Sequence, residues 1–296
     1  MNLNVYLQEK KDLVDAALDR YLPPAEKFPR SVHQAMRHIL FAGGKRLRPL
    51  LALSAGELVG GNTRNILPCA CALELIHTYS LIHDDLPAMD NDDYRRGMLT
   101  THKQFGEATA VLAGDALLTE AFRLLSCEEV KEKFPAGVLI EVINEVAFTA
   151  GSGGMIGGQV VDIESEGKEI DLPLLEYIHT HKTGALILAS VRMGTKLGGA
   201  NAAEIGALTR YGESIGLAFQ IVDDLLNVEG DREEMGKSPG TDAVQSKATY
   251  PHLLGVSESK RRAEDLVASA HKALEPFGSK ADTLKEIATF IISRRY

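Results

Sequence analysis

The chain is poor in cysteine, with only three such residues, at positions 69, 71 and 127 of 296. Three cysteines at this spacing are too few for a disulfide framework or a zinc site. The N-terminal segment lacks the apolar core of a secretory signal peptide. The longest charge-free stretch, residues 146–161, is glycine-rich and too short to cross a bilayer. These absences predict a cytoplasmic protein with reduced thiols and no membrane span.

Positive charge is also in deficit, because 32 Lys and Arg residues stand against 41 Asp and Glu residues, which gives a net charge of -9. Such a chain lacks the basic face of a general nucleic-acid binder, so no nucleic-acid partner is expected. An apolar content of 45% and a charged content of 25% exclude a disordered or collagen-like chain. No linker or break in composition divides the sequence, which predicts a single domain over residues 1–296.

Signals for β-strands are nearly absent, since apolar residues rarely alternate with polar ones, and no sheet is expected. Apolar residues instead recur at helical spacing, as at Leu51, Ala55, Leu58 and Val59. Helices are predicted over residues 49–60, 68–84, 109–126, 137–150, 155–162, 172–197, 202–228, 257–274 and 281–293. The pattern therefore predicts an all-α bundle of ten or more helices.

Five aspartates crowd into residues 84–93, which read DDLPAMDNDD and follow an apolar helical run. Like charges at this spacing repel one another, and aspartate is a poor helix former. A bound Mg²⁺ would offset that cost, because it takes carboxylates together with phosphate oxygens of a substrate. Pro87 should end the helix just after Asp85, so that Asp84 and Asp85 project from its last turn and Asp90 returns from the loop. The alternative is a solvated acidic loop.

A second pair, Asp223-Asp224, ends another apolar helical run. Asn227 lies four residues after Asp223 and shares its helix face, and Gln220 lies on the same surface. If the two aspartate-bearing helices packed side by side, the two pairs could hold several Mg²⁺ ions on one diphosphate.

Basic residues that could bind the phosphates of such a substrate occur in several places. They are Lys45, Arg46 and Arg48 in the segment GGKRLRP, Arg95 and Arg96 after the first cluster, Lys182 in HKTG, and Lys237 and Lys247 in a long polar loop. A cation just before a helix is well placed for a phosphate. For the two adjacent arginines the alternative is an internal ion pair with Asp92 or Asp93.

Together these motifs resemble those of the trans-isoprenyl diphosphate synthases, and most closely the bacterial farnesyl diphosphate synthases. The resemblance covers nearly the whole chain. It rests on GGKRLRP, LIHDDLPAMDNDDYRRG, GGQVVDI, HKTGALI, FQIVDDLLNVEGD, GKSPGTD and KATYP, in that order. It implies an all-α, isoprenoid-synthase-type bundle around a deep central cavity, assembled as a homodimer.

The resemblance also implies a reaction. Isopentenyl diphosphate would be joined to dimethylallyl diphosphate and then to geranyl diphosphate, which gives farnesyl diphosphate. Three Mg²⁺ ions per site, with Mn²⁺ as a substitute, would assist ionisation of the allylic diphosphate. The double bond of isopentenyl diphosphate would attack the cation, and the released diphosphate would take the proton.

Carried over position by position, the resemblance assigns a role to each site residue. The metal ligands would be Asp84, Asp85, Asp90 and Asp223. The allylic diphosphate would contact Arg95, Lys182, Lys237 and Lys247, and isopentenyl diphosphate would contact Gly44, Lys45, Arg48, His77 and Arg96. The catalytic set would be Lys182, Thr183, Gln220, Asp84 and Asp223, with Thr183 and Gln220 near the developing cation. Gln159 and Asp162 would support the allylic site, or simply pair inside the helical core.

His77 lies seven residues before Asp84 and thus on the same helix face, although a satisfied core histidine is the alternative. Tyr79, five residues before Asp84, and the neighbouring Ser80 resemble the farnesyl type, as do the inserted Pro87 and Ala88. A bulky ring at Tyr79 would close the floor of the cavity and limit the product to fifteen carbons.

Asn227 departs from the family, whose second motif usually ends in a third aspartate, so weaker support for the third metal is expected. The nearest alternative function is a geranyl or geranylgeranyl diphosphate synthase. A terpene cyclase would not need Lys45 and Arg48 for a second diphosphate. A noncatalytic prenyltransferase subunit would be expected to lose its metal ligands, and only Asn227 departs.

Overall fold

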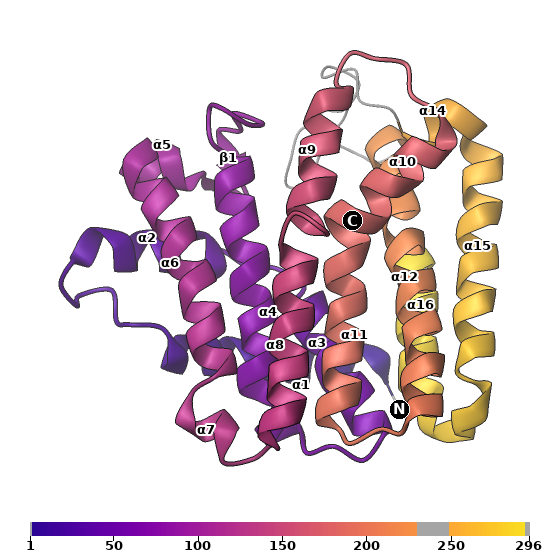
Figure 1. Ribbon diagram of the computed structural model, residues 1–296. Coiled ribbons are helices and arrows are strands. Elements are labelled where there is room, and N and C mark those ends of the chain that lie inside the picture. The colour runs from indigo at the N-terminus through magenta and orange to yellow at the C-terminus, as the bar shows by residue number, and fades with distance from the viewer. Residues whose placement is uncertain (1, 230–248, 294–296) are drawn as a thin grey trace. The chain divides into compact units, whose positions relative to one another are not determined.

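A computed structural model of the chain describes residues 2–229 and 249–293 (Figure 1). Its α-helices are α1 (Leu3–Tyr21), α2 (Arg30–Leu40), α3 (Leu47–Leu58), α4 (Thr63–Asp84), α5 (Thr101–Phe105), α6 (Glu107–Leu125), α7 (Glu128–Lys131), α8 (Ala136–Ala150), α9 (Met155–Ser165), α10 (Leu172–Ile178), α11 (Ala185–Leu197), α12 (Ala202–Glu229), α14 (Tyr250–Leu254), α15 (Val256–Ala273) and α16 (Asp282–Ser293). A π-helix, η1 (His179–Gly184), joins α10 to α11, and a 3₁₀ helix, η2 (Glu275–Ala281), precedes α16. The prediction of an all-α chain with ten or more helices is confirmed.

The helices form two compact units. The amino-terminal unit comprises Asn2–Leu50 and Thr63–Leu139, and the carboxy-terminal unit comprises Leu51–Asn62 together with the described residues from Ile140 onward. The first aspartate motif lies in the amino-terminal unit and the second lies in the carboxy-terminal unit. Each unit therefore has its own core and its own group of candidate functional residues.

Helix α4 forms the core of the amino-terminal unit. Of its 22 residues, 14 are buried, because a helix that is apolar on all sides must be covered on all sides. It packs against α1, α2, α6 and α7. In the described part of the chain α4 is the one helix long and apolar enough to cross a membrane, but 78% of its most apolar window is buried inside the protein. That burial is typical of a core helix.

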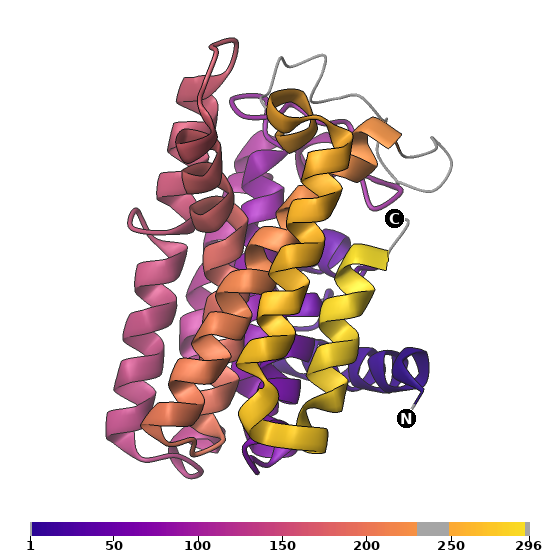
Figure 2. The same cartoon turned by 90° about the vertical axis from the view of Figure 1, so that its right-hand side faces the viewer.

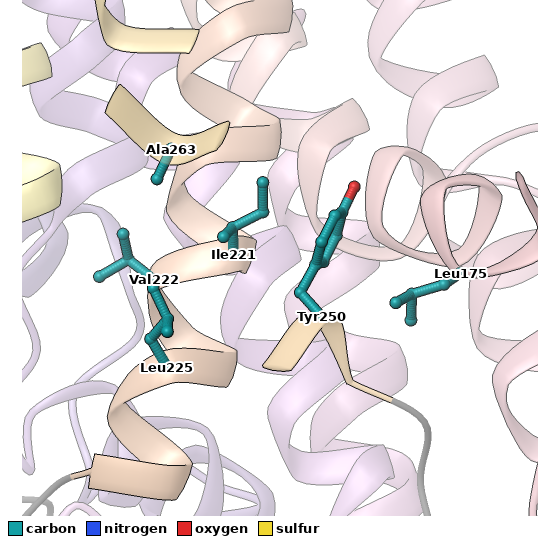
Figure 3. Packing of buried hydrophobic residues seen from close by; sticks show 6 residues of the cluster. All are labelled: Leu175, Ile221, Val222, Leu225, Tyr250 and Ala263. Atoms are coloured by element: carbon teal, nitrogen blue, oxygen red, sulfur yellow. The ribbon is translucent and has the colours of Figure 1, made fainter. Parts of the chain in front are cut away.

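The long helix α12 forms the core of the carboxy-terminal unit. Figure 2 shows α12 and α15 side by side, with α16 next to them, and α11 packs along another side of α12. Leu175 of α10, Tyr250 of α14 and Ala263 of α15 join a cluster of buried α12 side chains just before the end of that helix. In Figure 3 the Tyr250 ring lies between Ile221 and Leu175. The core thus connects the second aspartate motif to Tyr250.

Several predicted boundaries are wrong. Helix α4 begins at Thr63, five residues before Pro68, because a proline removes one N–H donor without stopping a helix that is otherwise buried. The predicted helix over residues 172–197 is interrupted by η1. Helices α1 and α2 were not predicted, although α2 buries Ala35, Met36, Ile39 and Leu40 at helical spacing.

The prediction that the chain has no sheet is wrong at one hairpin. Strands β1 (Tyr94–Arg95) and β2 (Met98–Leu99) pair antiparallel, with Arg95 opposite Met98. Arg96 and Gly97 form the two-residue turn, with φ of +53° and +75°. Positive φ at both central residues is what a type I′ turn requires. Gly97 adopts it at little cost, whereas Arg96 is held in a conformation that L-residues disfavour.

Candidate active site

The first aspartate motif begins where α4 ends, at Asp84, as Pro87 predicted. The backbone then turns back on the helix end, because the Asp90 amide donates to the Asp84 carbonyl at 2.8 Å and the Asn91 amide donates to the Leu86 carbonyl at 3.1 Å. The prediction that Asp90 returns from the loop to the helix end is confirmed. The side chains of Asp84 and Asp90 therefore start from neighbouring backbone positions.

Asp85 is fully buried and binds the guanidinium of Arg95 on β1. Arg95 Nε donates to Asp85 Oδ1 at 2.8 Å, Arg95 Nη2 donates to the same oxygen, and Nη2 also reaches Asp92 Oδ2 at 3.3 Å. A buried ion pair is costly to break, since about 3–5 kcal/mol is lost when one charge is left alone. The hairpin is thus fixed to the end of α4, and internal pairing, the alternative weighed for Arg95, is observed.

Gly44 and Arg96, both predicted to bind substrate, are brought together. A Cβ at Gly44 would lie 2.9 Å from Arg96 Cζ, so only glycine lets the guanidinium lie so close to the backbone. Arg96 Nη1 donates to the Ile39 carbonyl at 3.2 Å, and Nη2 lies 3.7 Å from Glu74 Oε1. Arg96 is therefore paired with Glu74 and not with Asp92 or Asp93.

His77 lies among positive charges. Burial, followed by the charges of Arg48, Arg96 and Arg95, holds the pKa of His77 well below its usual range. The imidazole is consequently neutral at pH 7 and can act as a hydrogen-bond donor without adding to the cationic charge. A group of guanidiniums around a neutral donor is a setting that attracts a phosphate or diphosphate.

The carboxylates of the first motif suit a hard cation in one particular mode. Among residues 2–229 and 249–293, no three Asp, Glu, His or Cys side chains are gathered into a metal-binding group. Mg²⁺ rarely uses such a cage, because it retains waters and binds one or two carboxylates plus substrate phosphates. Oxygen donors at Asp84, Asp85 and Asp90 fit that mode.

In the carboxy-terminal unit Asp224 is buried and accepts hydrogen bonds from His179, Tyr250 and Gln220. Its Oδ2 accepts from His179 Nε2 at 3.0 Å and from the Tyr250 amide at 2.9 Å, and its Oδ1 accepts from Gln220 Nε2 at 3.3 Å. Burial lowers the pKa of His179 to about 4, so the ring is neutral and its Nε2 carries the donated proton. Asp223, the predicted metal ligand, is partly exposed.

Tyr250 extends this network. Its hydroxyl donates to Glu176 Oε1 at 3.1 Å, Arg262 Nη2 donates to the same oxygen at 2.5 Å, and its ring stacks on His179 with 5.4 Å between centroids. The sequence predicts no role for His179, Tyr250 or Glu176. The signal available was that His179 precedes HKTG and that Tyr250 belongs to KATYP.

Lys182 and Thr183 lie in the π-helix η1, a rare conformation that often marks functional sites. Lys182 Nζ pairs with Asp162 Oδ2 on α9 at 2.7 Å. Gln159, also on α9, has a buried Oε1 with no hydrogen-bond partner among the described residues. Gly158 faces η1 so closely that a Cβ there would lie 2.3 Å from the Lys182 amide nitrogen. The motifs GGQVVDI and HKTGALI are therefore in contact.

The predicted chain-length residues lie in the last turns of α4. Tyr79 is 5% exposed, and its hydroxyl finds no hydrogen-bond partner within the described residues. Burial, and then the negative charge of Asp84, raises the pKa of Tyr79 to about 12. Ser80 Oγ donates to the His77 carbonyl at 2.9 Å. Lys237 and Lys247 lie outside the described residues.

Comparisons with known proteins identify the class. The sequence model of the polyprenyl synthetase family matches residues 29–287. The chain is 48% identical to a dimethylallyltranstransferase of Fischerella ambigua over 296 residues, which cover all of this chain and 84% of that protein. It is 47% identical to a geranylgeranyl diphosphate synthase of Cyanophora paradoxa over 99% of this chain and 97% of the relative.

A solved structure agrees with these relatives. The crystal structure of an FPP/GFPP synthase from Zymomonas mobilis superposes with a TM-score of 0.88 at 38% identity, covering 98% of this chain and 99% of that one. The chain therefore belongs to the polyprenyl synthetase family, and it is a prenyltransferase with the all-α fold of the isoprenyl diphosphate synthases.

The close approach of α9 to η1 gives the first prediction. Replacing Gly158 by alanine places a methyl group against the backbone at Lys182, so η1 must shift. We expect Gly158→Ala to lower the free energy of unfolding by about 1–3 kcal/mol in urea titrations.

The matched control is Gly206→Ala on α12, where a Cβ would meet only ordinary van der Waals contact at 3.7 Å. This helical glycine should tolerate alanine, with a gain of about 0.4–1 kcal/mol. Equal stability of the two variants would show that the contact between Gly158 and Lys182 is not tight.

Proposed function

We propose that this prenyltransferase makes farnesyl diphosphate from isopentenyl diphosphate and, in turn, dimethylallyl and geranyl diphosphate. The observation that carries the proposal is the group of arginines around His77, two helical turns before the first aspartate motif. A cationic place for a second diphosphate is needed when two diphosphates react with each other. A terpene cyclase, with one diphosphate, has no use for it.

The carboxylates would bind the metal ions. Asp84, Asp90 and Asp223 are partly exposed and are proposed as Mg²⁺ ligands, and Asp85 is a further proposed ligand whose Oδ1 is shared with Arg95. When bound, Mg²⁺, or Mn²⁺ in its place, would supply the positive charge that stabilises the departing diphosphate. Three ions per site are proposed from the family resemblance.

The other residues would bind and orient the two substrates. Lys182, Arg95 and the two lysines Lys237 and Lys247 are proposed to hold the allylic diphosphate, while Gly44, Lys45, Arg48, His77 and Arg96 hold isopentenyl diphosphate. The neutral His77 donates a hydrogen bond to a phosphate oxygen. Thr183 and Gln220 are proposed to lie beside the allylic carbon and to stabilise its charge as the carbon–oxygen bond breaks.

The wider organisation follows from the same family. One family match spans both compact units, which supports a single functional domain. Homodimer formation is proposed, supported by the apolar side chains Ile140 and Phe148, which are 67% and 68% exposed on α8. The three free cysteines, two of them buried, support a reducing, cytoplasmic location.

The direct test is an assay of the purified chain with both five-carbon diphosphates and Mg²⁺, followed by sizing of the products. A fifteen-carbon diphosphate is expected, and addition of EDTA should abolish its formation. Absence of any product longer than five carbons would refute the prenyltransferase proposal for these substrates. A twenty-carbon product would favour the geranylgeranyl alternative that the Cyanophora relative represents.

Tyr79 provides a prediction about chain length. Its ring is buried one turn before the aspartates, so removing it in Tyr79→Ala should deepen the space for the growing chain and shift products beyond fifteen carbons. The matched control is Tyr79→Phe, which keeps the ring and removes only a hydroxyl that has no hydrogen-bond partner in the described residues. If chromatography gives the same product distribution for all three proteins, Tyr79 does not limit chain length.

Asn227 provides a prediction about the second motif. An amide carries no charge, so the Asn227→Asp variant should support the metal better and show turnover equal to or above that of the parent protein. The comparison is Asp223→Asn, which removes a proposed ligand charge and should lower turnover about 100-fold or more. A large loss of activity in Asn227→Asp would contradict the proposal that residue 227 supports a metal ion.

A further inference from the structure

Two buried charged residues, Arg46 and Glu74, have no role in the proposed chemistry. Arg46 is 2% exposed and Glu74 is 1% exposed. The Arg46 guanidinium donates to Asp15 Oδ1 on α1 at 2.7 Å, to Glu74 Oε1 on α4 at 2.8 Å and to the Leu40 carbonyl at the end of α2 at 2.5 Å. One side chain therefore joins three helices.

Glu74 connects this cluster to the proposed diphosphate site. Its Oε1 accepts from Arg46 and also lies 3.7 Å from Nη2 of Arg96. Arg46 follows directly after Lys45 and lies two residues before Arg48. A single buried carboxylate thus contacts one proposed ligand residue, Arg96, and the immediate neighbour of another, Lys45.

The backbone at both arginines is strained. In the described residues three non-glycine residues have positive φ, and two of them are Arg46 at +52° and Arg96 at +53°. Gly43 and Gly44, just before Lys45, also have positive φ, at +124° each. Such conformations persist only where surrounding contacts hold them, and the shared contact here is Glu74.

Stability alone is a poor reason for this arrangement. Buried ion pairs add little net stability compared with apolar packing of the same volume, because both charges lose their hydration. What the pairs do supply is geometry: with its guanidinium held inward, Arg46 leaves the preceding Lys45 exposed at the surface. A guanidinium with its fixed fork of donors suits that task better than a flexible ammonium.

We propose that Glu74 and Arg46 are positioning residues for the isopentenyl diphosphate site, holding Arg96 and the segment 43–49 in the strained backbone that presents the proposed ligands. This inference rests on the proposed function. It assigns to Glu74 no contact with substrate. The residue acts through the two arginines that share its Oε1.

The test is steady-state kinetics of the full chain with each substrate varied in turn. Glu74→Gln keeps one acceptor oxygen but removes the negative charge that both guanidiniums share, so the KM for isopentenyl diphosphate should rise about tenfold. The KM for the allylic substrate should stay within about twofold of the parent value, because removing a ground-state contact affects only the substrate concerned. Glu74→Asp keeps the charge but shortens the reach, and the same KM should rise.

Asp15→Asn serves as a second variant in case Glu74 is essential for folding, because Asp15 lies at the partly exposed end of the cluster. It removes the charge that pairs with Arg46 and with Lys11, and it should raise the same KM about threefold. The matched control is Glu120→Gln, which removes a carboxylate paired with Arg123 on α6 of the same unit and should leave both KM values unchanged. The dissociation constant of isopentenyl diphosphate, measured by calorimetry without the allylic substrate, should rise in the same variants as its KM.

The outcomes separate the inference from the proposed function. If the parent protein makes no product, the proposed function fails. If the parent protein is active, two results overturn the positioning role. One is an unchanged KM for isopentenyl diphosphate in Glu74→Gln and Asp15→Asn, and the other is an equal rise of the KM values for both substrates. A fall in the KM for isopentenyl diphosphate would overturn it as well, since it would show that Glu74 only reduces the positive potential of the site.

Discussion

Every charge that these helical units bury must meet a partner, and that requirement shapes the regions around both aspartate motifs. An ion transferred from water into a protein interior loses hydration worth several kcal/mol, which only close pairing returns. In the amino-terminal unit Asp85 is paired with Arg95, and Glu74 with Arg46. In the carboxy-terminal unit Asp224 accepts hydrogen bonds from the neutral His179 imidazole and from the Tyr250 amide. Each partner comes from another segment, so the pairing fixes that segment onto α4 or α12.

The same requirement explains why unusual backbone gathers near the motifs. The segments that bring these partners to the core helices turn sharply, and a two-residue turn of type I′ requires positive φ at both central residues. The hairpin that carries Arg95 turns through Arg96 and Gly97, and the segment before α3 turns through two glycines and Arg46. The π-helix at Lys182 is the corresponding irregularity in the carboxy-terminal unit, and it requires a glycine on the facing helix. Strain in these segments is held in place by contacts to rigid helices.

The sequence predicts the helical architecture well because helical periodicity is a local signal. The end of α4, the return of Asp90 and the surface shared by Gln220 and Asp224 could all be expected from spacing. The roles of Glu74, Arg46 and His179 could not, because a buried ion pair between residues 28 positions apart leaves no periodic trace. The hairpin at residues 94–99 was missed because its strands have two residues each, too few for alternation to show. The start of α4 was predicted five residues too late, because proline usually marks the start of a helix. Here the burial of the surrounding residues outweighs the hydrogen bond lost at Pro68.

The two Asp-Asp pairs share one asymmetry. Successive residues at a helix end point in different directions, about 100° apart within the helix, so the two side chains of a pair meet different surroundings. In both motifs the second aspartate is the buried one: Asp85 and Asp224 are 0% and 4% exposed, whereas Asp84 and Asp223 are partly exposed. The buried member fixes a neighbouring segment, and the partly exposed member keeps access to solvent, where a hydrated cation can approach it. A doubled aspartate therefore places one carboxylate among buried donors and leaves its neighbour at the surface. The partial exposure of Asp84 and Asp223 supports both as proposed metal ligands.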